Sequence, residues 1–143
     1  MIIHMPKYTM RTISSIHGTI EPEIFDILSN VTLKILDYLK IEEHLFITVV
    51  AGTHIVTGDG PEDAGFGAYT TGLRSIIIAG LIPDDDDPDF DFTREEWIDS
   101  LKETLIHEII HYKQDLDEVL EDTEENESLT EEMTRRLMKQ LAL

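Results

Sequence analysis

The sequence has 143 residues, a formal net charge of −19 and no cysteine. Its length suits one domain over residues 1–143 that buries its own core. The negative charge repels nucleic-acid phosphates and anionic membranes, so we expect neither as a partner, whereas a basic polypeptide would be attracted. The absence of cysteine excludes disulfides, thiolate metal sites and thiol nucleophiles, so a metal would have to be held by histidines and carboxylates.

The sequence contains no pattern typical of a signal peptide or a transmembrane helix. The residues from Met1 to Pro6 lack a charged region followed by a long apolar one. No apolar run approaches the length that spans a bilayer. We therefore expect a soluble protein of the cytoplasm.

The N-terminal half predicts strands around one amphipathic helix. Residues 7–17 are rich in Thr, Ile and Ser and suggest a strand. From Glu23 to Leu39 apolar residues recur every three or four positions, which predicts a helix with Pro22 in its first turn. Three more strands are expected, with a Gly-rich loop after the first of them, at Leu45–Ala51, Gly67–Thr71 and Arg74–Ala79.

The longest predicted helix begins at a capping box. Thr93 can cap its start within a Thr-x-x-Glu pattern, while Phe92 can pack against Trp97. We expect this helix over residues 94–118. Its apolar residues project onto the half opposite His107, so that half should face the core. They are Ile98, Leu101, Leu105, Ile109, Tyr112, Leu116 and Val119.

The remaining residues predict a turn and a last helix. Residues 122–126 contain no apolar side chain, which favours a turn. Acidic side chains crowd the start of the following segment and basic ones its end, near Leu141, as the helix dipole favours. The predicted fold is therefore α+β, in the order strand, helix, three strands, two helices.

The segment HEIIH, residues 107–111, carries the candidate chemistry. On a helix His107 and His111 lie one above the other on the same face, so both imidazoles can reach one metal ion. Glu108 lies about 100° further around the axis, which places its carboxylate beside the ion. From there it can take a proton from zinc-bound water and later give it to a leaving amine.

A catalytic zinc site needs a third protein ligand and an open position for water. Asp117, six residues after His111, is one candidate, but that arrangement needs a glycine where this chain has Gln114. The other possibility is a carboxylate on the last helix. The acids available there are Glu124, Glu125, Glu127, Glu131 and Glu132.

The segment NESLTE, residues 126–131, resembles the glutamate helix of the gluzincins, the thermolysin-like and aminopeptidase-like zincin metallopeptidases. The resemblance covers residues 45–132 in order of elements: sheet, edge strand, HEIIH helix, glutamate helix. It implies a minimal zincin-like α+β fold, with a small mixed sheet packed on the N-terminal helix. It also implies Glu127 as third zinc ligand and Glu131 as the acceptor that orients the first histidine. Ser128 with Glu131 equally forms an ordinary capping box.

The strand predicted at residues 74–79 has two possible roles. Zincins resemble one another in presenting an edge strand to an extended peptide substrate, and by that resemblance this strand would be the edge. Ile76 and Ile78 share one face while Ile77 takes the other, which is equally typical of a strand within the core.

A donor for the oxyanion of the reaction is not evident. Larger gluzincins take a Tyr or His from beyond the glutamate helix, and this chain has neither after Tyr112. Tyr69, His54 or Arg135 could take that role.

Two function hypotheses follow. The first is a zinc-dependent peptide-bond hydrolase, a small gluzincin-like metallopeptidase, with Glu108 as general base and acid and a polypeptide as substrate. The alternative is a zincin-fold structural or interaction subunit of a larger assembly with little or no catalytic activity.

Overall fold

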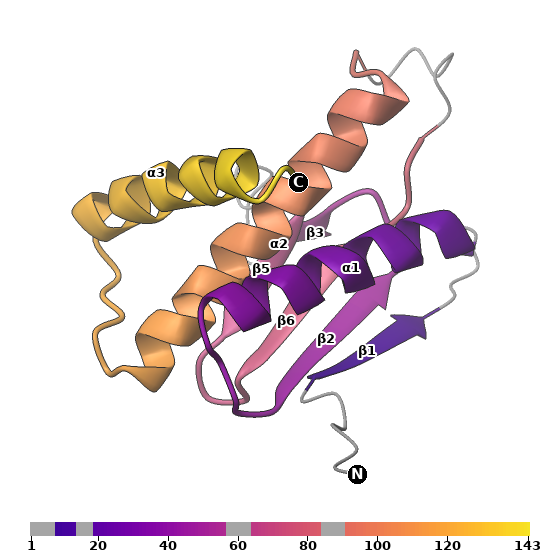
Figure 1. The fold of residues 1–143 in the computed structure, drawn as a ribbon. Helices are drawn as coiled ribbons and strands as arrows, with labels where there is room; N and C mark the ends of the chain where they lie inside the picture. Colours follow the sequence, from indigo (N-terminus) through magenta and orange to yellow (C-terminus); the bar gives the residue numbers. More distant parts are fainter. Residues whose placement is uncertain (1–7, 14–18, 57–63, 84–90) are drawn as a thin grey trace, which may run out of the picture.

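The computed structural model describes residues 8–13, 19–56, 64–83 and 91–143, which form a small α+β fold (Figure 1). The predicted α+β class is thereby confirmed. The strands are β1 Tyr8–Ile13, β2 Leu45–Val50, β3 Ile55–Val56, β4 Ala64–Gly65, β5 Gly67–Thr70 and β6 Ser75–Ala79. The helices are α1 Pro22–Tyr38, α2 Arg94–Leu116 and α3 Glu124–Gln140.

The main sheet is mixed and has the strand order β1-β2-β6-β5. Strands β1, β2 and β6 are parallel, and β5 runs antiparallel to β6. Strand β6 therefore lies inside the sheet, so of the two roles left open for residues 74–79 the core strand is confirmed and the edge strand is wrong. Its three isoleucines place side chains on both faces of an interior strand, and β5 is the edge instead.

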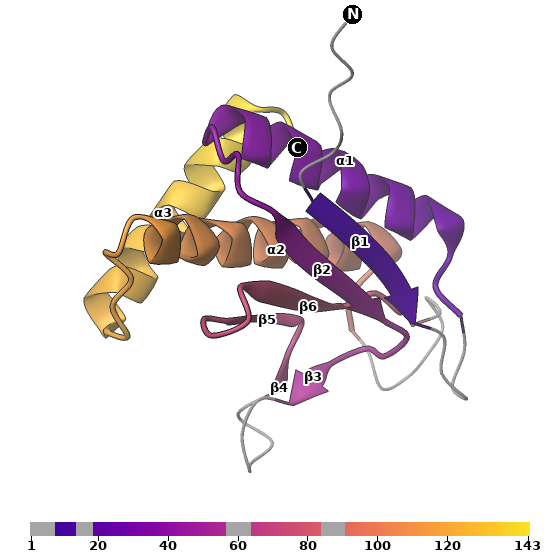
Figure 2. The same cartoon turned by 90° about the horizontal axis from the view of Figure 1, so that it is seen from below.

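One face of the sheet is covered by α1 and α2 (Figure 2). Successive residues of a strand point to opposite faces, so β2 buries alternate side chains. Leu45, Ile47 and Val49 are at most 1% exposed, whereas Phe46 between them is 46% exposed. The core lies between this face of the sheet and the two helices.

Helix α1 forms where the apolar period predicted it. Pro22 occupies its first turn, and the residues that recur at three and four steps point into the core. Those buried are Ile24, Leu28, Val31, Ile35 and Leu36. In the part of the chain that the structure describes, no helix combines the length and apolarity needed to cross a membrane.

Helix α2 begins as predicted and ends slightly earlier. The Thr93 side chain accepts a hydrogen bond from the Glu96 N–H, and the Glu96 carboxylate accepts one from the Thr93 N–H. Phe92 packs on Trp97 with ring centroids 6.3 Å apart. The helix ends at Leu116, so Val119 lies beyond it and is 60% exposed, contrary to the prediction that it faces the core.

Helix α3 begins within the segment that was predicted to be a turn. Thr123 caps it by accepting a hydrogen bond from the Asn126 N–H, and acidic side chains in the first turn suit the positive end of the helix dipole. The predicted connection is therefore confirmed at residues 122–123, which are not helical, and wrong at residues 124–126, which belong to the helix. Ser128 lies inside the helix, so its capping box does not start it.

The predicted Gly-rich loop contains a small second sheet. Strand β3 pairs antiparallel with β4, and each has two residues. Strands of two residues are too short to show an alternating pattern of apolar and polar residues, so the sequence did not predict them. The first predicted strand is described only over β1, and its residues 7 and 14–17 lie outside the described residues.

Gly67 lets the edge strand lie close to α2. A Cβ atom on Gly67 would be 2.6 Å from the Ile78 Cδ1 atom and 3.0 Å from both the Ile77 carbonyl oxygen and the Thr104 Cγ2 atom. The second contact is with backbone, which cannot rotate away. Only glycine fits β5 between β6 and α2 without displacing one of them.

We therefore expect Gly67→Ala to lower the free energy of unfolding by about 1–3 kcal/mol, because the added methyl group overpacks this contact. Gly72→Ala is the matched control, since a Cβ there meets nothing within 4 Å. Urea unfolding followed by circular dichroism measures both. Equal stability of the two variants would contradict the close approach of β5.

Candidate metal centre

Three side chains from two helices converge at one point. The Nε2 atoms of His107 and His111, one turn apart on α2, are 3.0 Å from each other. Glu127, in the first turn of α3, places one carboxylate oxygen 3.1 Å from His107 Nε2 and the other 2.8 Å from His111 Nε2. In the part of the chain that is described, these three residues form the group whose ligand atoms could hold a metal ion.

This geometry suits a tetrahedral cation such as zinc. Imidazole nitrogens bind zinc at about 2.0–2.1 Å and carboxylate oxygens at a similar length, which puts neighbouring ligand atoms about 3.3 Å apart. The observed separations of 2.8–3.1 Å are close to that value. Two nitrogen acceptors and a carboxylate that face one another also repel unless a cation or proton lies between them.

The surroundings of the histidines are largely closed to solvent. The side chains of His107 and His111 are 17% and 10% exposed, whereas that of Glu127 is 50% exposed. Burial lowers the pKa of His107, and electrostatic interaction with His111 lowers it further, while Glu127 raises it. The net lowering favours the neutral imidazole that binds a metal.

Glu108 lies beside the cluster and faces strand β5. Its carboxylate accepts a hydrogen bond from the backbone N–H of Tyr69. Burial raises the pKa of Glu108 from 4.5 to about 7, opposed by the charge of His111, reinforced by Glu127 and opposed by the Tyr69 N–H. A carboxyl group whose pKa is near neutrality can both accept and donate a proton.

The outer edge of β5 turns backbone groups toward the side where Glu108 lies. The Ala79 N–H donates to the Phe66 carbonyl at 2.8 Å, which makes these two residues a hydrogen-bonded pair of the antiparallel ladder. Such pairs alternate with pairs that make no ladder bonds, so the backbone groups of Gly67 and Tyr69 point away from β6. They face the side on which Glu108 receives its hydrogen bond.

A cleft runs along this edge and includes the cluster. Its volume is about 760 Å³, and it lies between β5, the polar face of α2 and the start of α3, with Asp122 among its lining residues. A second cavity of about 420 Å³ adjoins His107 and Glu108 and carries Glu103, Glu131 and Arg135. The two cavities place mainly acidic side chains around the cluster.

The structure brings together some of the predicted site residues and separates others. Glu131 lines the cavity beside His107, but the partner of its carboxylate is Arg135, at 3.6 Å. Tyr69 borders the cleft with its backbone, while its hydroxyl donates to Asp115 Oδ2 at 2.6 Å.

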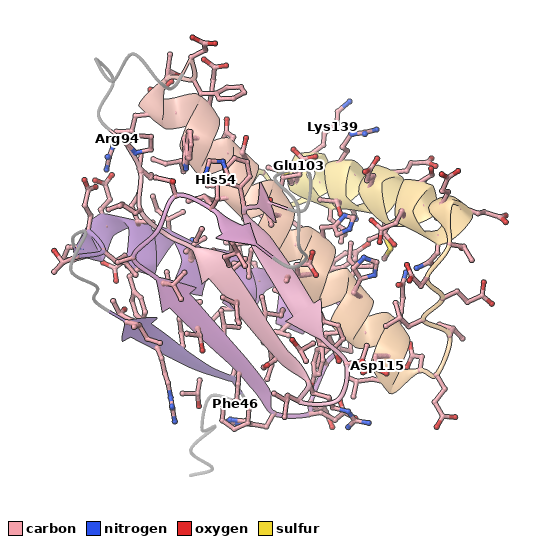
Figure 3. All side chains as sticks on the ribbon, turned by 180° about the vertical axis from the view of Figure 1, so that it is seen from behind. Phe46, His54, Arg94, Glu103, Asp115 and Lys139 are labelled. Atoms are coloured by element: carbon pink, nitrogen blue, oxygen red, sulfur yellow. The ribbon has the colours of Figure 1, made fainter. Side chains whose placement is uncertain are left out.

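His54 lies outside the cluster. Its ring is stacked on Phe66 and packed edge-on against Trp97, in the N-terminal part of α2, whereas Asp115 marks the opposite end of that helix (Figure 3). Of the three predicted oxyanion donors, His54 and the Tyr69 hydroxyl are therefore directed elsewhere, and Arg135 borders the cavity that Glu108 lines.

The competing third ligands lie elsewhere. Asp117 caps the C-terminus of α2 and pairs with Lys113 at 3.3 Å. Glu132 pairs with Arg136 at 3.2 Å, and the group of possible ligand atoms contains neither Glu124 nor Glu125 among the described residues. Glu127 is the acid that meets both histidines.

Sequence reasoning missed Gln114. Its Oε1 atom lies 3.0 Å from His111 Nδ1 and accepts a hydrogen bond from Asn126 Nδ2 at 3.1 Å. Its Nε2 atom donates to Thr130 Oγ1 at 3.1 Å. The signal was its place within about 60° of His107 on the helical projection, which marked it as polar without indicating a partner.

Comparison with known proteins supplied no relative. No family model matches the sequence, and no curated protein or solved structure matches it either. The geometry of the cluster and the cleft is therefore the basis for inferring a function.

Glu108 makes the stability of the metal-free protein depend on pH. Its folded pKa, about 7, lies above the ordinary value of 4.5, so the folded state holds more protons between these values and stability falls as pH rises through that range. We expect Glu108→Gln to remove this dependence and to stabilise the metal-free protein at pH 8 by about 1–3 kcal/mol.

Urea unfolding in the presence of a chelator, at pH 5 and pH 8, measures this difference. Glu95→Gln, in the first turn of α2, is the control. An identical pH dependence in wild type and Glu108→Gln would show that the carboxylate is not held in a desolvated position.

Proposed function

We propose that the chain is a zinc-dependent peptide-bond hydrolase of the zincin type. His107, His111 and Glu127 would hold the ion, and Glu108 would be the general base and acid. The observation that carries this proposal is the convergence of two imidazole nitrogens and a carboxylate within 4.8 Å, beside a buried glutamate and a free strand edge. The order of sheet, HEIIH helix and glutamate helix, which resembles that of the gluzincins, supports it.

The chemistry divides between the ion and the protein. Zinc bound here would supply Lewis-acid chemistry, since it polarises a carbonyl and lowers the pKa of water. Glu108 would take the proton of the attacking water and deliver it to the leaving nitrogen. The Tyr69 N–H directs the Glu108 carboxylate toward the cleft that the ligands line.

A polypeptide in extended conformation is the substrate that the cleft suits best. The backbone groups of Gly67 and the Tyr69 carbonyl at the outer edge of β5 can pair with another strand, an interaction that needs no particular side chain. Glu103, Glu131 and Asp122 border the cleft and its adjoining cavity, so basic residues near the cleaved bond would be favoured.

A second candidate function is a metal-binding interaction subunit with little turnover. The observation that favours it is the engagement of the Tyr69 hydroxyl by Asp115 and the stacking of His54 on Phe66. Loss of one oxyanion donor typically costs about 2.7–4 kcal/mol of transition-state stabilisation. Slow hydrolysis or none would then accompany an intact metal centre.

We expect the purified protein to bind one zinc ion and to be stabilised by it, by about 2.7 kcal/mol at a free zinc concentration 100 times the dissociation constant. His111→Ala and Glu127→Ala should lose most of this stabilisation. His44→Ala and Glu125→Ala are matched controls from outside the cluster and should keep it. Metal analysis and thermal unfolding with and without zinc make the comparison, and equal binding by Glu127→Ala would exclude the proposed ligand set.

We expect the zinc-loaded protein to hydrolyse unfolded basic polypeptides, and Glu108→Gln to lower the rate by about 10²–10⁴-fold while zinc stays bound. Glu95→Gln, far along α2 from the cluster, should retain the activity. Mass spectrometry of a peptide library after digestion measures both. Zinc binding without cleavage in the wild type would favour the interaction subunit.

A further inference from the structure

Gln114 joins the two helices that supply the metal ligands. One amide group contacts His111 on α2 and both Asn126 and Thr130 on α3, over distances of 3.0–3.1 Å. Thr130 is 1% exposed, so the contacts lie in the interface between the helices. Neither the zinc chemistry nor the proton transfers proposed above use this side chain.

The hydrogen bonds fix the orientation of the Gln114 amide. The Thr130 hydroxyl lies 2.8 Å from the Asn126 carbonyl oxygen, which can only accept, so Thr130 must donate its proton there. The Thr130 oxygen is then free to accept, and the group that donates to it is Gln114 Nε2. The other end of the amide, Oε1, consequently faces His111 and Asn126.

This orientation selects one tautomer of His111. Since Gln114 Oε1 can only accept, the Nδ1 atom of His111 must carry a proton. In the neutral ring the lone pair then lies on Nε2, the atom that points at His107 and Glu127. The backbone carbonyl of Asn126 on α3 therefore fixes the proton of His111 on Nδ1. It acts through the hydrogen-bonded side chains of Thr130, Gln114 and His111.

The same amide holds the part of α3 that carries Glu127. Asn126 precedes Glu127 directly, and Thr130 lies less than one turn after it. The Glu127 side chain is itself half exposed, so packing around it does little to hold its carboxylate. Its approach to the histidines depends on where the first turns of α3 lie on α2.

We propose that Gln114 is a positioning residue of the metal centre, which presents His111 Nε2 to the ion and holds the first turns of α3 so that Glu127 completes the ligand set. The proposal rests on the metal centre of the proposed function and deepens it. Two of the three ligands would be set by one side chain that does not touch the ion. Residues that orient ligands in this way typically change metal affinity by 10–100-fold when replaced.

The first test compares zinc affinity by competition with a chelator. Gln114→Leu removes both the acceptor and the donor, and we expect its zinc affinity to fall by about 10–100-fold. Gln114→Glu keeps an acceptor of the same length for His111 Nδ1–H, so it should retain most of the affinity. A merely structural role would give the opposite order, because a buried charge is harder to accommodate than an apolar side chain.

A matched pair on α3 tests the same chain of bonds without changing α2. Thr130→Val removes the hydroxyl that orients Gln114, whereas Thr134→Val removes an equally buried hydroxyl that donates to the Thr130 carbonyl at 2.7 Å. We expect zinc affinity to fall on the order of 10-fold in Thr130→Val and to be unchanged in Thr134→Val. Equal losses in the two variants would overturn the proposal, and this pair remains informative if Gln114→Leu fails to fold.

The second test needs no metal. In the chelated protein, at a pH where the imidazoles are neutral, the nitrogen NMR shifts of the His111 ring should report a proton on Nδ1 in the wild type and a shift toward Nε2 in Gln114→Leu. An unchanged tautomer would overturn the proposal. If the wild type fails to bind zinc, the proposed function fails while the tautomer result still decides the role of Gln114.

Discussion

The meeting of Glu127 with two histidines across the interface between α2 and α3 is the interaction on which the site depends. Helix α3 buries Thr130, Thr134 and Leu137 but leaves the Glu127 side chain half exposed, so packing and hydrogen bonds behind the site bring the carboxylate into reach. The convergence of three electron-rich groups is unfavourable without a cation between them. The fold therefore creates a position where a bound cation would offset the electrostatic cost of the arrangement.

Strand β5 lines the cleft beside the candidate metal centre and is bonded to the helix that carries the two histidines. Tyr69 is held at two points, because its N–H donates to Glu108 and its hydroxyl donates to Asp115. These bonds join the edge strand to the middle and the end of α2. Gly67 permits the close approach, since any larger residue would meet Thr104 and the backbone of β6. The edge strand and the Glu108 carboxylate are consequently held against each other, with backbone groups of β5 turned toward the cleft.

Local signals in the sequence predicted the helices better than the strands. The capping box at Thr93 and the apolar period of α1 depend on residues within a few positions of each other, and both helices formed where expected. The start of α3 was placed too late because the acidic residues after Thr123 were taken as a turn, although they suit a helix N-terminus. Whether β6 lies at the edge or in the core stayed open, because strand order depends on pairing between distant segments, which the sequence of one strand does not contain.

The sequence by itself determined that His107 and His111 share one face of a helix with Glu108 beside them, because the helical period fixes that relation within two turns. The sequence limited the candidates for the third ligand to a few acidic residues, and the resemblance to the gluzincins singled out Glu127. Only the tertiary structure decided which acid meets the histidines and that Gln114 connects them to α3. The physical reason is that these contacts arise from the way one helix lies across another, and that placement follows from the packing of the whole core.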